Sequence, residues 1–250
     1  MGDMLSTEQR GSDKKEQSAG SECLFYLDLM SHEVQNFNQA VLGYLELIQN
    51  DASINEDMKH YLITAIHQVR NSSQLIDDVK KIAHLGMVSE EMFESMSLNS
   101  IVEDAVSYLK KEYPGKNILI DTTTPGDTIR IKATDALTDV VFNLLSNAVK
   151  FDTSDEVHIG VKISPADGKA GMIDLAIEDR GPGIPDNLKK ILSSEMPPDE
   201  KTKTVRGMGL LLARAATKRF GGRLIISDRV QGDHTQGAKV IIRLPEVRSR

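Results

Sequence analysis

MIDLAIEDRGPGIPD, residues 172–186, changes its pattern halfway. Its first eight residues are strand-like, and the next seven contain two glycines and two prolines. Gly181 and Gly183 permit positive φ and a close approach of the backbone to a ligand, and Pro185 suits the first turn of a helix. The stretch therefore predicts a strand that ends at Asp179, a tight turn and a helix.

The same alternation of strands and helices extends on both sides of this stretch. Helices are predicted at 97–116, where Pro114 and Gly115 end the helix, and at 136–151 and about 208–220. Strands are predicted at 117–124, 128–134, 157–164, 172–179, 223–230 and 238–245. Residues 97–247 are thus expected to form an α/β sandwich of helices on one sheet.

The chain before this domain has a different pattern. Apolar residues recur at alternating steps of three and four over residues 24–48, and again from Met58 to about Gly86 after a polar break. This spacing predicts a helical hairpin over residues 21–90. Two helices with narrow apolar stripes enclose little core, so we expect two chains to pair as a homodimer with a four-helix bundle. Residues 1–20 lack periodicity and are expected to form a disordered tail.

Composition limits the class of protein. The chain has 250 residues, of which 40% are hydrophobic and 27% charged, as in a soluble globular protein. The helical hairpin followed by alternating helices and strands gives the expected fold class, α+β. No apolar run approaches the roughly 20 residues that cross a bilayer, and no secretory signal opens the chain, so we expect no membrane segment and a cytoplasmic location. The net charge of −7 and the absence of a long Lys/Arg run argue against nucleic acid as a partner.

The stretch FNLLSNAVKF, residues 142–151, places Asn143, Asn147 and Lys150 on one helical face, because they are four and three residues apart. Amide oxygens are suitable ligands for Mg²⁺, which takes waters and phosphate oxygens as its other ligands. Lys150 would neutralise a phosphate. The alternative is a helix that simply turns polar residues toward solvent.

Two further stretches suit the same ligand. The Asp179 carboxylate is placed to accept a hydrogen bond from an exocyclic amino group such as that of adenine. The alternative is a plain connection from strand to helix, in which Asp186 is a charge at the helix start. RGMGLLLARAATKRFGG, residues 206–222, puts Gly207 and Gly209 at a helix N-terminus, where bare amides attract phosphate. Its alternative is a flexible loop entering a helix with an ordinary glycine stop.

In this order, the three stretches resemble the N, G1 and G2 boxes of the ATP-binding catalytic domain of sensor histidine kinases, within the gyrase, Hsp90 and MutL superfamily. The resemblance spans nearly all of residues 97–247. It implies that the domain binds ATP and Mg²⁺, with Asn143 and Asn147 toward the metal. The residues that it implies for nucleotide binding are Asn143, Asn147, Lys150, Asp179, Gly181, Gly183, Gly207, Gly209 and Leu210.

Ser31, His32 and Glu33 resemble the start of the H-box, which carries the phosphoacceptor histidine of these kinases on a helical hairpin. In the heptad frame His32 falls at position f, farthest from the apolar seam. Glu33 would hold the other ring nitrogen or take up the proton. Asn36 resembles the residue that orients water for dephosphorylation of the partner. The resemblance implies a kinase that phosphorylates His32 and passes the phosphoryl group to an aspartate of a response regulator.

Other features leave alternatives open. His67 also falls at an exposed f position, but Gln68 rather than an acid follows it. Leu211 replaces a glycine often found in the G2 box, Phe37 replaces a proline often found in the H-box, and residues 193–206 lack a Phe-rich box. A degenerate kinase acting as a dimeric binding module is therefore one alternative. A slow ATPase of the superfamily is another, although those enzymes usually have Glu where this chain has Asn143.

Overall fold

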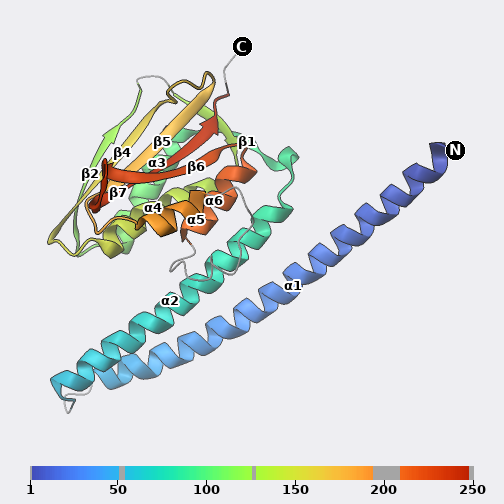
Figure 1. The fold of residues 1–250 in the computed structure, drawn as a ribbon. Coiled ribbons are helices and arrows are strands. Elements are labelled where there is room, and N and C mark those ends of the chain that lie inside the picture. Colours follow the sequence, from blue (N-terminus) through green and yellow to red (C-terminus); the bar gives the residue numbers. More distant parts are fainter. Residues whose placement is uncertain (1, 51–53, 126–127, 194–208, 248–250) are drawn as a thin grey trace. The chain divides into compact units, whose positions relative to one another are not determined.

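The computed structural model describes residues 2–50, 54–125, 128–193 and 209–247, and within them all side chains except those of residues 2–23, 25, 191 and 193. The chain divides into two compact units, Met1–Met87 and Val88–Arg250 (Figure 1).

The first unit is a helical hairpin, as the heptad spacing predicts. Helix α1 spans Gly2–Gln49 and helix α2 spans Glu56–Met87. Asn55 begins α2 as an N-cap, since its Oδ1 accepts a hydrogen bond of 2.8 Å from the amide of Met58. Residues 2–20 belong to α1, which differs from the disordered tail expected there.

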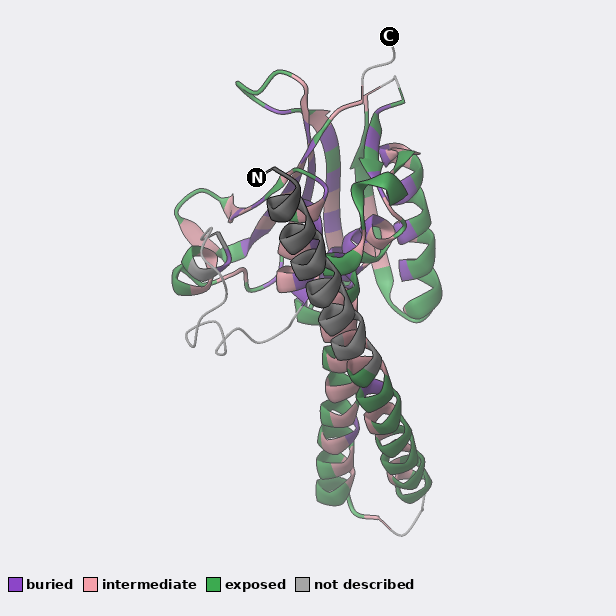
Figure 2. Ribbon diagram, turned by 90° about the vertical axis from the view of Figure 1, so that its right-hand side faces the viewer, coloured by how far each residue is buried: buried purple, intermediate pink, exposed green. Residues whose placement is uncertain are grey.

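Helix α1 has two apolar stripes, and only one of them faces α2. Gln35 and Asn38 donate hydrogen bonds to Asp77, Ser72 and Ser73 of α2, which identifies the contact face. Half-buried apolar residues lie on this face, namely Leu27, Val34, Leu42 and Leu45. A second apolar stripe of α1 stays exposed, and Figure 2 shows that much of the hairpin is exposed. This stripe consists of Met30, Phe37, Val41, Tyr44 and Ile48, and Phe37 and Tyr44 are 66% and 70% exposed.

The second unit contains a two-stranded and a five-stranded sheet. Strands β1 and β3 pair antiparallel, and the larger sheet has the order β2-β4-β5-β7-β6, in which only β2 and β4 are parallel. The elements are the 3-10 helix η1 (Glu90–Met92), β1 (Glu94–Ser97), α3 (Leu98–Glu112), β2 (Asn117–Thr123), β3 (Arg130–Ala133), α4 (Ala136–Phe151), β4 (Glu156–Pro165), β5 (Met172–Asp179), α5 (Asp186–Ser193), α6 (Gly209–Arg219), β6 (Arg223–Val230) and β7 (Asp233–Pro245).

Helices cover one face of the five-stranded sheet (Figure 1). Alternate residues of the strands are buried on this face, and they pair across the sheet, as Ile177 does with Val161 on one side and Val240 on the other. The opposite face carries charged cross-strand pairs. Arg243 donates two hydrogen bonds of 2.7 and 2.8 Å to Asp174, and Lys239 lies 2.7 Å from Glu178. The sheet is thus apolar toward the helices and polar on its other side.

These elements confirm the predicted fold class, a helical hairpin followed by an α/β sandwich. Strand β1 is not expected from the sequence, because Glu94–Ser97 contains a single apolar residue, Met96. It is a strand because it pairs with β3. Ser97 then caps α3, since its Oγ accepts a hydrogen bond from the amide of Ser100.

Candidate functional site

Asp179 is the last residue of β5. Side chains alternate along a strand, so its carboxylate points to the same side as Ile177, which is the face that the helices cover. Its Oδ1 accepts two main-chain hydrogen bonds, from the amide of Gly181 at 2.9 Å and from the amide of Ala238 at 3.1 Å. Both amides bond to the same oxygen, and in the described part of the chain Oδ2 has no such main-chain donor, so it can receive a donor from a ligand.

Burial raises the pKa of the Asp179 carboxyl above its usual range. The amides of Ala238 and Gly181 oppose this shift by stabilising the ionised form, and the negative charge of Asp152 adds to it. Arg229 lowers the pKa more weakly. Asp179 is therefore a hydrogen-bond acceptor that protonates more readily than a carboxylate in water.

The backbone of the turn after Asp179 passes so close to the backbone of β7 that only glycine fits at the two contact positions. Gly183 has a φ of 69°, and a Cβ added to it would lie 1.7 Å from the carbonyl oxygen of His234. Gly237 has a φ of 113°, and a Cβ added there would lie 2.0 Å from the carbonyl oxygen of Asp179. The two crossings fix the turn to the start of β7.

The predicted phosphate side of the site forms where α6 begins against α4. A Cβ added to Gly209 would lie 3.2 Å from Nδ2 of Asn147 and 4.0 Å from Cβ and Cγ of Asn143. Asn143 is only 8% exposed. Gly209 opens α6, whose first amides have no partner within the helix, so both asparagines lie beside a potential anion site.

Helix α4, which carries the predicted N box, lies next to parts of the other two predicted motifs. Its middle touches Gly209, and its C-terminal end lies beside the turn after β5, because a Cβ added to Gly181 would lie 3.7 Å from the carbonyl group of Phe151. Lys150, also predicted to bind the nucleotide, is exposed in the last turn of α4, and Leu210 is half-buried in α6. Gly207 lies outside the described residues, as do Lys201, Lys203 and Arg206.

The residues around Gly209 suit a magnesium ion that is carried by phosphates. Within the described ranges, no group of three or more His, Cys, Asp or Glu side chains is placed to hold a metal ion. Asn143 and Asn147 carry neutral amide groups, and both lie beside Gly209 at the start of α6. Such a donor set fits Mg²⁺ only together with phosphate oxygens and water.

The predicted phosphoacceptor lies on the hairpin. His32 is exposed, and Nδ2 of the Asn36 amide lies 3.2 Å from its Nδ1, as expected for side chains four residues apart on a helix. Glu33 is also exposed, while Ser31 is buried. The ring contact in the structure is thus with Asn36, where the sequence suggested Glu33.

Two other histidines have acidic partners that the sequence did not reveal. His84 of α2 lies 3.2 Å from Asp28 of α1, and His158 lies 2.8 Å from Glu156 in β4. Asp28 is 56 positions from His84, so only the hairpin brings them together. His67 is exposed on α2 and remains a useful comparison for His32.

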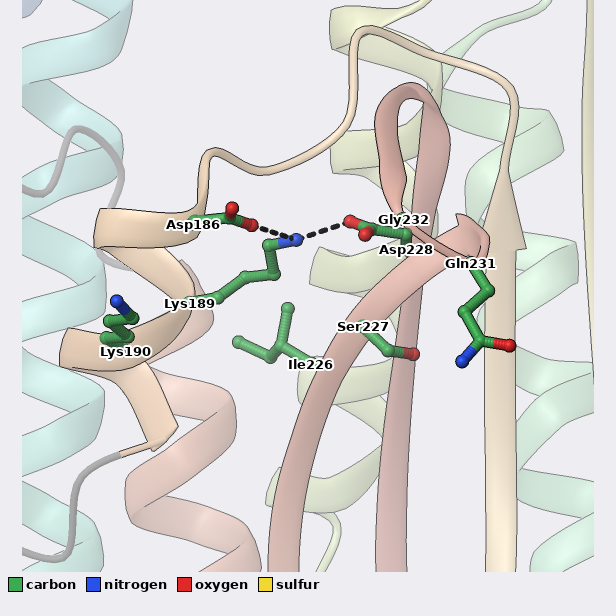
Figure 3. Close-up of a pocket in the computed structure, with 8 residues that line it drawn as sticks. All are labelled: Asp186, Lys189, Lys190, Ile226, Ser227, Asp228, Gln231 and Gly232. Atoms are coloured by element: carbon green, nitrogen blue, oxygen red, sulfur yellow. Dashed lines mark hydrogen bonds and ion pairs between the residues drawn. The ribbon is translucent and has the colours of Figure 1, made fainter.

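A cavity of about 490 Å³ lies elsewhere on the second unit, between α5 and the sheet-edge strand β6 (Figure 3). It shares no residue with the predicted nucleotide site. Lys189 reaches from α5 toward both Asp186 and Asp228, as the dashed lines in Figure 3 show. This cation is neutralised by two carboxylates, so we assign the cluster to holding α5 on the sheet rather than to phosphate binding.

Comparison with known proteins extends these observations. The family described as histidine kinase-, DNA gyrase B-, and HSP90-like ATPase matches residues 132–248. The virulence sensor protein BvgS of Bordetella bronchiseptica is 26% identical over 219 residues, which cover 80% of this chain and 17% of BvgS. The signal transduction histidine-protein kinase/phosphatase MprB of Mycobacterium tuberculosis is 24% identical over 192 residues, which cover 76% of this chain and 37% of MprB. The chain thus spans 17% and 37% of the length of these curated relatives.

A solved structure shares the fold. Full-length ShkA in complex with AMPPNP superposes with a TM-score of 0.59 at 21% sequence identity, and the match covers 89% of this chain and 46% of ShkA. Among the helices in the described part of this chain, none is both long enough and apolar enough to cross a membrane.

Proposed function

We propose that this chain, a sensor histidine kinase by family with an ATP-binding domain of the histidine kinase-, DNA gyrase B- and HSP90-like type, transfers the γ-phosphoryl group of ATP to His32. One observation carries the proposal: Asn147 of α4 lies against Gly209, and the C-terminal end of the same helix lies beside Gly181. Helix α4 thus borders both the proposed phosphate side of the nucleotide site, at Gly209, and its proposed base side, at Gly181.

In this proposal, the residues of the second unit position ATP. The Asp179 carboxylate accepts a hydrogen bond from the amino group of adenine, and the amides at the start of α6 face the phosphates. Asn143 and Asn147 would hold Mg²⁺, which supplies neutralisation of the phosphate charge when bound. Lys150 adds a positive charge at the end of α4. Phosphoryl transfer needs little else from the protein besides such positioning.

The hairpin provides the nucleophile. In the reactive tautomer of His32, the hydrogen is on Nδ1. The Asn36 amide, rotated so that its oxygen and nitrogen exchange places, then accepts a hydrogen bond from Nδ1 at the observed contact. Nε2 then keeps its lone pair. The bond from Nε2 to the γ-phosphorus forms while the bond from phosphorus to the bridging oxygen breaks, and ADP leaves. Glu33, the adjacent exposed carboxylate, offsets the positive charge that the ring gains, and it takes up the Nδ1 proton through solvent, since Asn36 is the residue in contact with the ring.

The phosphohistidine then passes its phosphoryl group to an aspartate of a response regulator receiver domain, and Asn36 orients water when the regulator is dephosphorylated. Exposure of His32 supports this proposal, because a partner protein must reach the ring. The uncovered stripe from Met30 to Ile48 supports a homodimer in which a second hairpin packs on it.

The full chain incubated with γ-labelled ATP and Mg²⁺ tests the proposal. We expect an acid-labile label on the protein that disappears in His32→Gln and remains in the matched variant His67→Gln. Free phosphate without labelled protein would instead identify a slow ATPase. A chain that binds ADP but yields neither product would be a binding module, and the kinase proposal would be wrong.

A further inference from the structure

Asp152 is a buried carboxylate at the edge of the predicted nucleotide site. It directly follows α4 and is 7% exposed. Its Oδ1 accepts hydrogen bonds from the amide of Ser154, at 2.9 Å, and from the Ser154 hydroxyl. Oδ1 is therefore held by its own loop, and within the described residues no hydrogen bond reaches Oδ2.

The end of α4 brings Asp152 close to Asp179. The amide of Gly181 holds the Asp179 carboxylate, and the same glycine lies against the carbonyl group of Phe151, which is bonded to Asp152. The charge of Asp152 is among the causes that raise the pKa of Asp179, and Arg229 of β6 is the cation that opposes it. Each carboxylate has one oxygen held by nearby donors and one oxygen left over.

We propose that Asp152 is a specificity-determining residue, which accepts the second hydrogen of the exocyclic amino group whose first hydrogen is donated to Asp179. The inference rests on the proposed function, since it assumes that this site takes an adenine nucleotide. An amino group carries two hydrogens, and two carboxylates on one side of a base offer two acceptors. The pair would thereby select an amino-purine over a purine that lacks this group.

The pair also makes base recognition depend on pH. A protonated Asp179 is a poorer acceptor for an amino group, and its raised pKa brings protonation closer to neutral pH. Preference for the amino group is therefore present above the pKa of Asp179 and lost as the pH falls through it. Replacing Asp152 by a neutral residue removes one cause of the raised pKa and moves this loss to lower pH.

Calorimetry on the full chain tests the inference, with ADP and with purine riboside 5′-diphosphate, which lacks only the amino group. The variants are Asp152→Asn and the matched control Asp155→Asn, an exposed residue of the same loop. In Asp152→Asn the amide oxygen stays with Ser154 and the amide nitrogen opposes the ligand's donors. We expect the preference for ADP to fall about tenfold or more, since hydrogen bonds to charged groups contribute roughly 1.5–3 kcal/mol. The affinity for purine riboside diphosphate and the control should be unchanged.

A titration of the wild-type preference from pH 8 to pH 5 is a second measurement that needs no variant. The ratio of the two affinities cancels the titration of the phosphates and should fall toward acid pH. Equal effects of Asp152→Asn on both ligands would overturn the role of Asp152, and a ratio that is constant with pH would overturn the pH dependence. Failure of the wild type to bind either ligand would overturn the proposed function itself.

Discussion

In the hairpin, the candidate residue His32 is exposed and contacts a side chain, that of Asn36, whereas in the second unit Asp179 is held by two main-chain amides beneath covering helices. The two units also differ in how much of their apolar surface is buried. Among the described apolar side chains of the hairpin, only Ile66 and Leu85 are buried, while every strand of the five-stranded sheet except β2 contributes buried residues. The second unit is complete as one copy, and the hairpin leaves an apolar stripe for a partner.

The largest expected effect tests the second unit. Gly183→Ala would place a methyl group where the carbonyl oxygen of His234 lies, at a φ of 69°. We expect the unit to lose at least about 3 kcal/mol of unfolding free energy. Differential scanning calorimetry without nucleotide measures this loss, and helical circular dichroism from the hairpin should persist.

Gly232→Ala is the matched control for this prediction. Gly232 also has a positive φ, 82°, but nothing lies within 4 Å of an added Cβ. We expect a cost of about 1–2 kcal/mol from the left-handed conformation alone. If both variants lose the same stability, the crossing of the turn and β7 does not depend on glycine, and the second unit is less rigid than described.

The next effect tests the hairpin. Phe37→Glu places a charge in the exposed stripe of α1 and should raise the dissociation constant of the dimer by at least about 100-fold, because two rings per dimer are lost at roughly 1.5–3 kcal/mol each. Light scattering over a concentration series measures it. Tyr108→Glu, at an exposed position of α3, should leave the dimer intact. A wild-type chain that is monomeric at micromolar concentration would refute the bundle.

The smallest effect concerns charge at the phosphate side. Asn147→Asp adds a negative charge beside Gly209 and should weaken ATP binding about tenfold through repulsion of the phosphates. Calorimetry on the full chain gives the affinity, and Asn187→Asp on the exposed side of α5 adds the same charge as a control. Unchanged affinity in Asn147→Asp would remove this residue from the phosphate site.

The sequence predicts what depends on neighbouring residues. The strand, turn and helix of residues 172–186 follow from local pattern, and so does the place of Asp179 at the strand end. The donor Ala238 could not be found in this way, because it is 59 positions from Asp179 and meets it only through the pairing of β5 with β7. Gly237 gave a faint signal, a glycine just before an apolar strand, but glycines there also serve as ordinary turn residues.

The hairpin shows a second limit of the sequence. Heptad spacing predicts two helices and the exposure of His32, both of which the structure has. It does not say which of two apolar stripes on α1 meets α2, because Val34, Leu42 and Leu45 are as apolar as Phe37 and Tyr44. Hydrogen bonds from Gln35 and Asn38 decide this question, and they join residues more than 30 positions apart.

The main-chain donors around Asp179 have a consequence for inhibitors. Every amino acid except proline supplies an amide, so exchanging the side chain at Ala238 does not delete the donor that holds the carboxylate. A compound anchored on this acid would therefore meet few escape mutations. Resistance would have to arise by losing the acid itself, or through Gly183 and Gly237, whose alteration damages the fold.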